Sequence, residues 1–83
     1  MEKSEFNARF GAFLRHKRNL KGWSQSRLAS ELGNNSQNIS RIERGELSPT
    51  LFWISKLADA FEDELFVLIK EFHEFDQKTS KQF

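Results

Sequence analysis

Residues 24–45 read SQSRLASELGNNSQNISRIERG, and this stretch predicts two short helices with a turn between them. Ser24 and Asn35 are of the residue types that cap helix N-termini, so a helix can follow each of them. Gly33 and Gly45 stand where the first and the second helix should stop. The first helix has an inner face whose members share helical spacing: Leu28, Ala29 and Leu32. The stretch therefore has the outline of a helix-turn-helix.

The second helix of this pair has an unusual composition, because Asn, Ser and Gln prefer caps and turns to helix interiors. Ile39 and Ile42 stand three residues apart and can hold the helix on the core. Such packing makes a poor intrinsic helix propensity tolerable. At about 100° per residue, the polar residues fall on other faces, several of them open to a partner: Ser36, Gln37, Ser40, Arg41 and Arg44.

Composition limits the chain to one small domain with a single core. It has 83 residues, of which 37% are hydrophobic and nine are Phe. The absence of Cys and of a signal-like start leads us to expect a soluble protein of the reducing cytoplasm. The longest unbroken apolar run, residues 65–69, has five residues, far fewer than the roughly 20 that a membrane span requires.

The near-neutral net charge of +1 hides an asymmetry along the chain. Residues 1–45 carry nine Lys and Arg against four acids, whereas residues 46–83 carry four against eight. A basic half beside an acidic half indicates that one face meets an anion, although a split of this kind can also arise by chance.

The remaining segments also predict helices. A first helix capped by Ser4 ends near Leu20, and its apolar stripe is Phe6, Phe10, Phe13 and Leu14. A fourth helix begins at Ser48, Pro49 or Thr50, with the stripe Leu51, Ile54, Leu57, Ala58 and Phe61. A fifth runs from about Asp63 to about Phe75, with three acids in its first turn. We expect residues 1–75 to form one domain and residues 76–83 a flexible tail. No alternating strand pattern occurs, so the predicted fold is all-α.

Read together, these residues resemble the phage repressor and Cro type of helix-turn-helix proteins, the Xre family. The resemblance covers about residues 9–66 and is carried, in order and spacing, by Gly22, Ser24-Gln25, Leu28-Ala29, Leu32-Gly33, Ile39-Ser40, Ile42-Glu43, Gly45, Pro49 and Leu57-Ala58. It implies a compact five-helix bundle of the phage-repressor type, and sequence-specific binding of double-stranded DNA by a transcriptional regulator. A departure is Asn34, where the family often has a small apolar residue.

The resemblance also implies roles for single residues. The predicted base contacts are Ser36, Gln37 and Arg41, because amides and guanidinium groups suit base edges in the major groove. The predicted contacts to the DNA backbone are Gln25, Asn35, Arg44 and Lys21. Arg18 and Glu43 match positions that often form a structural pair. The simpler interpretation is that Gln25, Gln37 and Arg41 are ordinary surface residues and that Asn35 only caps a helix.

One short recognition helix reads few base pairs, so we expect a homodimer on a palindromic operator. In the fifth helix, Leu65, Leu68, Ile69 and Phe72 fit one core-facing stripe. The predicted dimer interface consists of apolar residues left off such stripes or beyond the core: Trp53, Phe66, Val67 and Phe75. The alternative is that a loop or the tail covers them within one monomer.

An enzyme is not expected. The two histidines, His16 and His73, are far apart, and no glycine-rich phosphate loop occurs. We therefore expect no catalytic residues, no metal, no cofactor and no small-molecule ligand. The competing hypothesis is an antitoxin or another interaction module whose main partner is a protein.

Overall fold

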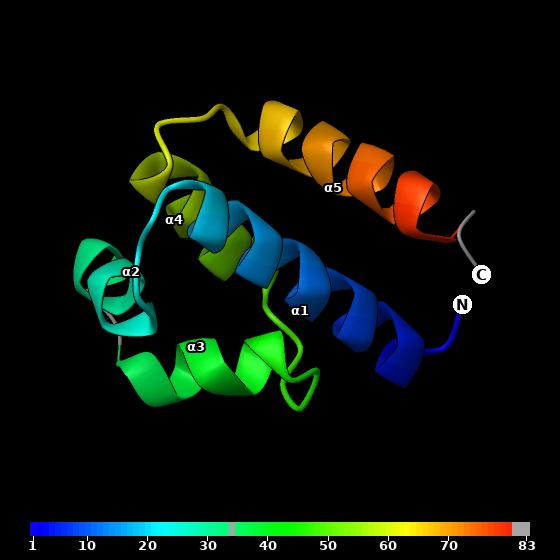
Figure 1. Ribbon diagram of the computed structural model, residues 1–83, viewed down its shortest axis with the longest axis horizontal. Coiled ribbons are helices and arrows are strands. Elements are labelled where there is room, and N and C mark those ends of the chain that lie inside the picture. Colours follow the sequence, from blue (N-terminus) through cyan, green and yellow to red (C-terminus); the bar gives the residue numbers. More distant parts are fainter. Residues whose placement is uncertain (34, 81–83) are drawn as a thin grey trace.

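The fold is a bundle of five helices, shown in Figure 1 for the computed structural model. The structure describes residues 1–33 and 35–80, except for the side chain of residue 80. The helices are α1 (Lys3–Leu20), α2 (Gln25–Leu32), α3 (Ser36–Glu43), α4 (Leu51–Ala60) and α5 (Leu65–Ser80). These described residues contain no strand, and the predicted all-α fold is confirmed.

Three helices begin at side-chain caps. The side chains of Ser24, Asn35 and Thr50 each accept a hydrogen bond from the backbone N–H three residues later, at 3.0, 2.9 and 3.0 Å. Each bond satisfies one of the N–H groups that a helix start leaves unpaired. The predicted cap of the first helix was wrong, because Ser4 lies inside α1 and Glu2 is the N-cap, without a side-chain bond, whereas the predicted end near Leu20 is confirmed.

The core forms where the apolar faces of all five helices meet. The largest fully buried side chains come from every helix: Leu14, Leu28, Ile39, Ile42, Leu57 and Leu68. In Figure 1, α1 runs through the middle of the molecule, with α3 on one side of it and α5 on the other. The bundle therefore carries two separate outer faces, one at α2 and α3 and one at α4 and α5.

α3 packs so closely on α1 that only glycine fits at the crossing. A Cβ atom on Gly11 would lie 2.7 Å from the carbonyl oxygen of Glu43, and it would also overlap the carbonyl oxygen of Ile42. Both atoms belong to the backbone, so neither can rotate away. This contact could not be predicted from the sequence, because a glycine inside a predicted helix has no periodic signal.

α5 is longer than the sequence predicts. It begins at Leu65, after the acidic segment 62–64 rather than within it, and continues through Ser80. The tail expected at 76–83 is therefore helical over residues 76–80, and residues 81–83 lie outside the described part. Arg9 of α1 pairs with Asp76 at 3.1 Å, which ties the added turn to the bundle.

Lys17 fixes α5 to α1 further along the bundle. Its Nζ lies 2.9 Å from carboxylate oxygens of both Asp63 and Glu71, and 5.1 Å from the ring centre of Phe61. Burial alone would lower the pKa of Lys17, but hydrogen bonds to Asp63 and Glu71 outweigh that effect and raise the pKa. The ammonium stays charged and joins α1, α5 and the α4–α5 connection.

Several apolar residues lie elsewhere than their spacing predicts. Leu51 and Ile69, which were expected in the core, are 65% and 46% exposed. Phe75 was expected at a dimer interface, but its ring packs within the monomer against Phe13 and His16, at 5.7 and 4.9 Å between ring centres. Trp53 and Val67 are only half-buried, and Trp53 packs against the core. Of the four predicted interface residues, Phe66 alone is strongly exposed, at 66%.

The Gly11 contact yields a stability prediction. Gly11→Ala forces α1 and α3 apart and should lower the free energy of unfolding by about 3 kcal/mol or more. Gly22→Ala is the matched control, since φ is 71° there and no atom lies within 4 Å of the added methyl group. In that variant the free energy of unfolding should fall by only roughly 1 kcal/mol, because alanine is strained in the left-handed backbone conformation. Urea denaturation followed by circular dichroism measures the free energy of unfolding of both variants. Equal losses of stability in Gly11→Ala and Gly22→Ala would contradict the close crossing of α1 and α3.

Candidate nucleic-acid interface

α3 combines a buried apolar side with an exposed polar side. Ile39 and Ile42 are 0% and 2% exposed and lie in the core. Gln37 and Arg41 are exposed and stand four residues apart, so they share one side of the helix. Ser36 is half-buried in the first turn. α3 lies along the lower edge of the molecule in Figure 1, where only one side of it meets the bundle.

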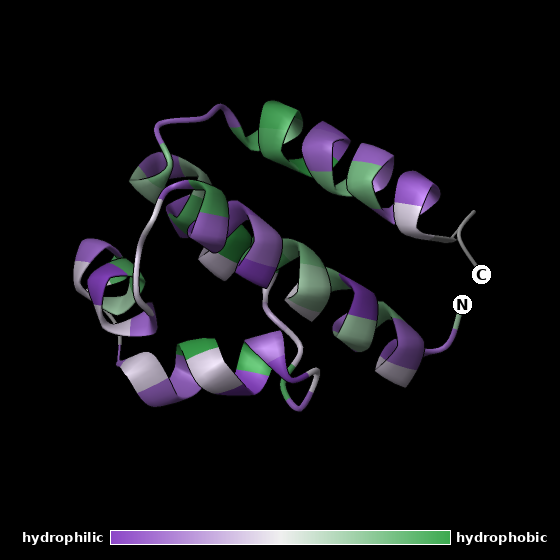
Figure 2. Ribbon diagram, viewed as in Figure 1, coloured by the Kyte–Doolittle hydropathy of each residue, from purple (hydrophilic) through white to green (hydrophobic). Residues whose placement is uncertain are grey.

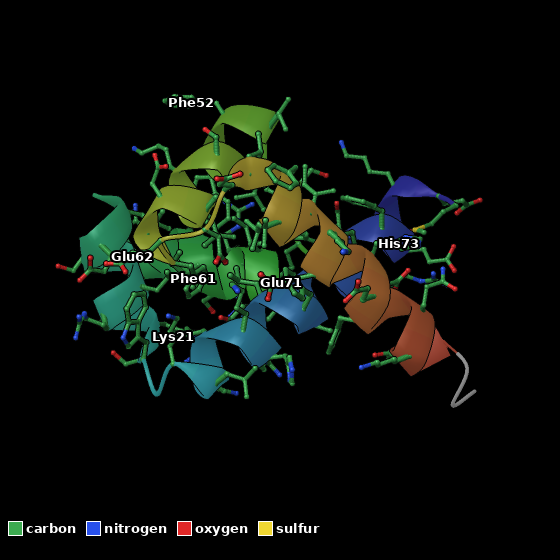
Figure 3. The ribbon with its side chains drawn as sticks, turned by 90° about the horizontal axis from the view of Figure 1, so that it is seen from above. Lys21, Phe52, Phe61, Glu62, Glu71 and His73 are labelled. Carbon is green, nitrogen blue, oxygen red and sulfur yellow. The ribbon has the colours of Figure 1, made fainter. Side chains whose placement is uncertain are left out.

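The residues predicted to contact the DNA backbone differ in their surroundings. Lys21 is exposed and directly follows α1, as Figure 3 shows. Arg44 is exposed too, but its guanidinium donates to Glu46 at 2.6 Å and to the hydroxyl of Ser40 at 2.5 Å. Hydrogen bonding to Arg44 lowers the pKa of Glu46, which therefore stays charged. Arg44 thus already has an anionic partner in the free protein.

Gln25 and Asn35 each have a role within the monomer. Gln25, at the start of α2, is half-buried, and its Nε2 donates to Glu43 at 3.0 Å. This bond uses one of the two N–H groups of the amide nitrogen. Asn35 is exposed and caps α3. Gln25 therefore contacts the C-terminal end of α3 from the start of α2, whereas Asn35 stands at the N-terminal end of α3.

A buried carboxylate joins the three helices of this region. Glu43 of α3, whose side chain is 0% exposed, receives Arg18 Nε at 2.6 Å and Arg18 Nη2 at 3.0 Å. Arg18 also donates to the carbonyl oxygen of Trp23 at 2.7 Å, which fixes the connection between α1 and α2. Together with the bond from Gln25, these contacts hold α1, α2 and α3 in one arrangement. Arg18 and Glu43 are thus paired in the structure.

The charge of Glu43 is maintained by its partners. Burial alone would raise the pKa of Glu43, but hydrogen bonds from Arg18 and Gln25 outweigh that effect and hold the pKa below its ordinary value. Sequence reasoning missed one contributor, Arg15, whose Nε lies 3.5 Å from Glu43. The available signal was the spacing of Arg15 and Arg18, which stand three apart on α1 and so share a side of it.

The described residues contain no group of three or more His, Cys, Asp or Glu side chains that could hold a metal ion. Across the same part of the chain, no helix is both long and apolar enough to span a membrane.

Comparisons with known proteins agree with this geometry. Residues 9–62 match the family of helix-turn-helix domains. The crystal structure of the restriction-modification controller protein C.AhdI from Aeromonas hydrophila is similar, with a TM-score of 0.75 and 34% identity over 82% of this chain and 99% of that chain. No curated protein matches the chain.

Two further solved structures share the fold. One is a transcriptional regulator of the HTH_3 family from Vibrio cholerae, with a TM-score of 0.75 and 26% identity over 83% of this chain and 39% of that one. The other is the clp gene regulator ClgR from Corynebacterium glutamicum, with a TM-score of 0.77 and 21% identity over 92% of this chain and 81% of that one. The second likeness is one of fold alone.

The fold and these matches define the class of protein as a helix-turn-helix DNA-binding protein. The chain belongs to the helix-turn-helix domain family and, within it, to the Xre-type transcriptional regulators. The family resemblance seen in the sequence is confirmed.

The Glu43 contacts predict a pH dependence of stability. Because the folded state lowers the pKa of this carboxyl, its contribution is complete above the unfolded pKa and is lost as the pH falls through the folded pKa. Glu43→Gln should lower the free energy of unfolding at pH 7 by about 3 kcal/mol, since Arg18 loses its buried partner. The variant should also have a flatter dependence on pH below about 5.

Urea denaturation between pH 7 and pH 3 measures this dependence. Glu46→Gln is the control, because its ion pair with Arg44 is exposed and should affect stability little. If Glu43→Gln and the wild type lost stability in parallel on acidification, Glu43 would not be the group responsible.

Proposed function

We propose that this protein binds a specific double-stranded DNA sequence as a homodimer and regulates transcription, with α3 in the major groove. The observation that carries the proposal is the division of α3 into two sides. Its isoleucines are fully buried, while Gln37 and Arg41 extend from the exposed side of the same helix. Eight residues of helix are about 12 Å long, which is comparable to the width of the major groove.

The chemistry of the exposed side suits base edges. A Gln amide can form two hydrogen bonds with adenine at N6 and N7, and an Arg guanidinium can do the same with guanine at O6 and N7. Gln37 and Arg41 lie one helical turn apart, so they can reach neighbouring base pairs. Ser36, one position before Gln37, can donate to a base or to a phosphate. These three residues are the proposed base contacts.

Phosphate contacts would set the position of α3 without reading the sequence. Gln25 keeps one amide N–H beyond its bond to Glu43, and it lies at the N-terminus of α2, where the helix dipole favours an anion. Asn35 is the N-cap of α3 and so lies at the N-terminus of that helix. Lys21 needs no rearrangement to attract DNA, whereas Arg44 must exchange Glu46 for a phosphate. Binding should therefore weaken as salt rises.

A second copy would supply the specificity that one short helix lacks. A single recognition helix reads only a few base pairs, too few to compete with the non-specific sites of a genome. Two copies related by a two-fold axis place their recognition helices about 34 Å apart, one turn of DNA. The face away from α3 has the exposed apolar residues for this contact, namely Leu51, Phe66 and Ile69. Figure 2 shows the hydrophobic first turn of α5 in green.

The comparisons support this proposal at the level of the protein class. The restriction-modification controller and the HTH_3 regulator are named as regulators, and both share this fold. We extend that role to this chain, with regulation by occupancy of an operator.

Selection from a random DNA pool tests the proposal. The recovered duplexes should contain two inverted half-sites about one helical turn apart. On the selected duplex, Gln37→Ala and Arg41→Ala should each cost about 1–3 kcal/mol and relax the preference at one or two base pairs. Affinities measured by fluorescence anisotropy on selected and random duplexes report both effects.

Two controls separate base contacts from electrostatics. Lys21→Ala should weaken binding to both duplexes similarly and reduce the salt dependence. Arg27→Ala removes an exposed arginine of α2 that is paired with Glu31, and it should leave the base preference unchanged. Equal losses on selected and random DNA for Arg41→Ala would assign Arg41 to the phosphate contacts instead.

A further inference from the structure

A hollow with wholly apolar walls opens between α1, α4 and α5, on the side of the bundle away from α3. It measures about 190 Å³ and is lined by Phe6, Phe10, Ile54, Leu68, Ile69 and Phe72. We propose that this hollow receives the ring of Phe66 from a second copy of the chain, and that each copy of the homodimer both gives and accepts one ring. The inference rests on the proposed homodimer and names the contact that forms it.

The hollow is preformed by contacts among its own aromatic walls. The ring of Phe72 meets Phe10 and Phe6 edge-on, at 5.3 and 5.7 Å between ring centres. Such edge-to-face pairs are stabilising and fix the orientation of the rings. Phe10 and Leu68 are 2% and 1% exposed, so the floor is held by the core. An occupant therefore needs no rearrangement of the bundle.

The size and the chemistry of the hollow suit one phenyl ring. An apolar protein cavity of about 150 Å³ stays dry and binds benzene. The hollow here is somewhat larger, at about 190 Å³, and every residue that lines it is apolar. Water gains no hydrogen bond from such walls, so the filled state is favoured by removal of apolar surface from water.

Among the described residues, two strongly exposed phenylalanines, Phe52 and Phe66, could supply the ring, and the structure favours Phe66. Phe66 stands three residues before Ile69 on α5, so it lies on the same side of the helix as the lip of the hollow. Phe52 stands two residues before Ile54, roughly 160° away around α4. Figure 3 shows Phe52 at the outer end of α4, away from the bundle. The Nζ of Lys56 also lies 5.7 Å from the ring centre of Phe52, whereas no aromatic or cation contact involves Phe66 among the described residues.

A two-fold dimer requires a self-complementary face, and this face carries both a protruding ring and a hollow. Phe66 does not fill the hollow of its own chain, because its ring is 66% exposed and is not among the residues that line the hollow. Leu51, Phe66, Ile69 and Phe6 together expose roughly 400 Å². A standard interface buries about 800 Å² on each partner, of which somewhat more than half is apolar. The patch therefore supplies most of the apolar area that a second copy needs.

Mixing two complementary variants tests the contact. Phe66→Ala removes the ring but leaves the hollow open, and Ile69→Trp crowds the lip of the hollow but keeps Phe66. Ile69 is 46% exposed, so the larger side chain does not disturb the core. Each variant alone should dimerise at least about tenfold more weakly than the wild type by analytical ultracentrifugation, as expected for loss of a central aromatic contact. A mixture should form a heterodimer tighter than either variant alone, because one ring meets one open hollow.

Phe52→Ala is the matched control, since it removes an exposed ring that faces away from the hollow. The Phe52→Ala dimer should dissociate at the same protein concentration as the wild-type dimer. Toluene should bind Phe66→Ala, detected by shifts of the Phe6 and Phe72 side-chain resonances, but it should not bind the wild-type dimer, whose hollows are filled.

The outcomes separate this contact from the homodimer itself. Three results would each overturn the ring contact while the homodimer stands. The Phe66→Ala dimer could dissociate at the same concentration as the wild-type dimer, or the mixture of variants could dimerise no more tightly than its components. Toluene could also bind equally to the variant and to the wild-type dimer. A wild type that stays monomeric when free and on the selected DNA would overturn the proposed homodimer as well.

Discussion

The arrangement of this protein depends on one buried carboxylate. Glu43 is the last residue of α3, and its side chain is 0% exposed, yet it is bound by Arg18 from α1 and by Gln25 from α2. A buried charge is costly unless it is paired and hydrogen-bonded, so the three helices can occupy only positions that complete this set. Directly beside it, Gly11 lets the backbone of α1 approach the last carbonyl groups of α3. Together these contacts determine how α3 lies on the bundle, and hence which of its sides is available to DNA.

α1, the central helix, separates two surfaces of different chemistry. On one side, α1 holds α3 through Glu43, and on the other it holds α5 through Lys17 with Asp63 and Glu71. The α3 side is rich in amides, hydroxyls and arginines, whereas the α4–α5 side combines apolar residues with the acidic half of the chain. In our proposal one surface reads DNA and the other joins two copies. A small domain can then place two reading helices at a set distance without an additional domain.

Much of the fold could be predicted from the sequence because helix signals are local. Capping residues and apolar spacing identified α2 and α3 closely, down to the caps Ser24 and Asn35. The end of α5 was missed because residues 76–80 carry no apolar stripe, and a distant partner, Arg9, binds Asp76. Periodicity likewise shows which residues share a side of a helix but not what that side meets, so the exposure of Leu51 and Ile69 could not be predicted. The Arg18–Glu43 pair was suggested by family resemblance, while the contribution of Arg15 depends on how α1 and α3 cross.

The central claim is that the exposed side of α3 reads the base sequence while the Glu43 contacts hold α3 in place. The most direct measurement is an NMR comparison of the protein bound to its selected duplex and to a random duplex of equal length. The account predicts that the side-chain resonances of Gln37 and Arg41 differ strongly between the two complexes, while those of Arg18 and Gln25 stay at the same positions in both. Identical α3 side-chain resonances in the two complexes, or differences confined to α4 and α5, would contradict it.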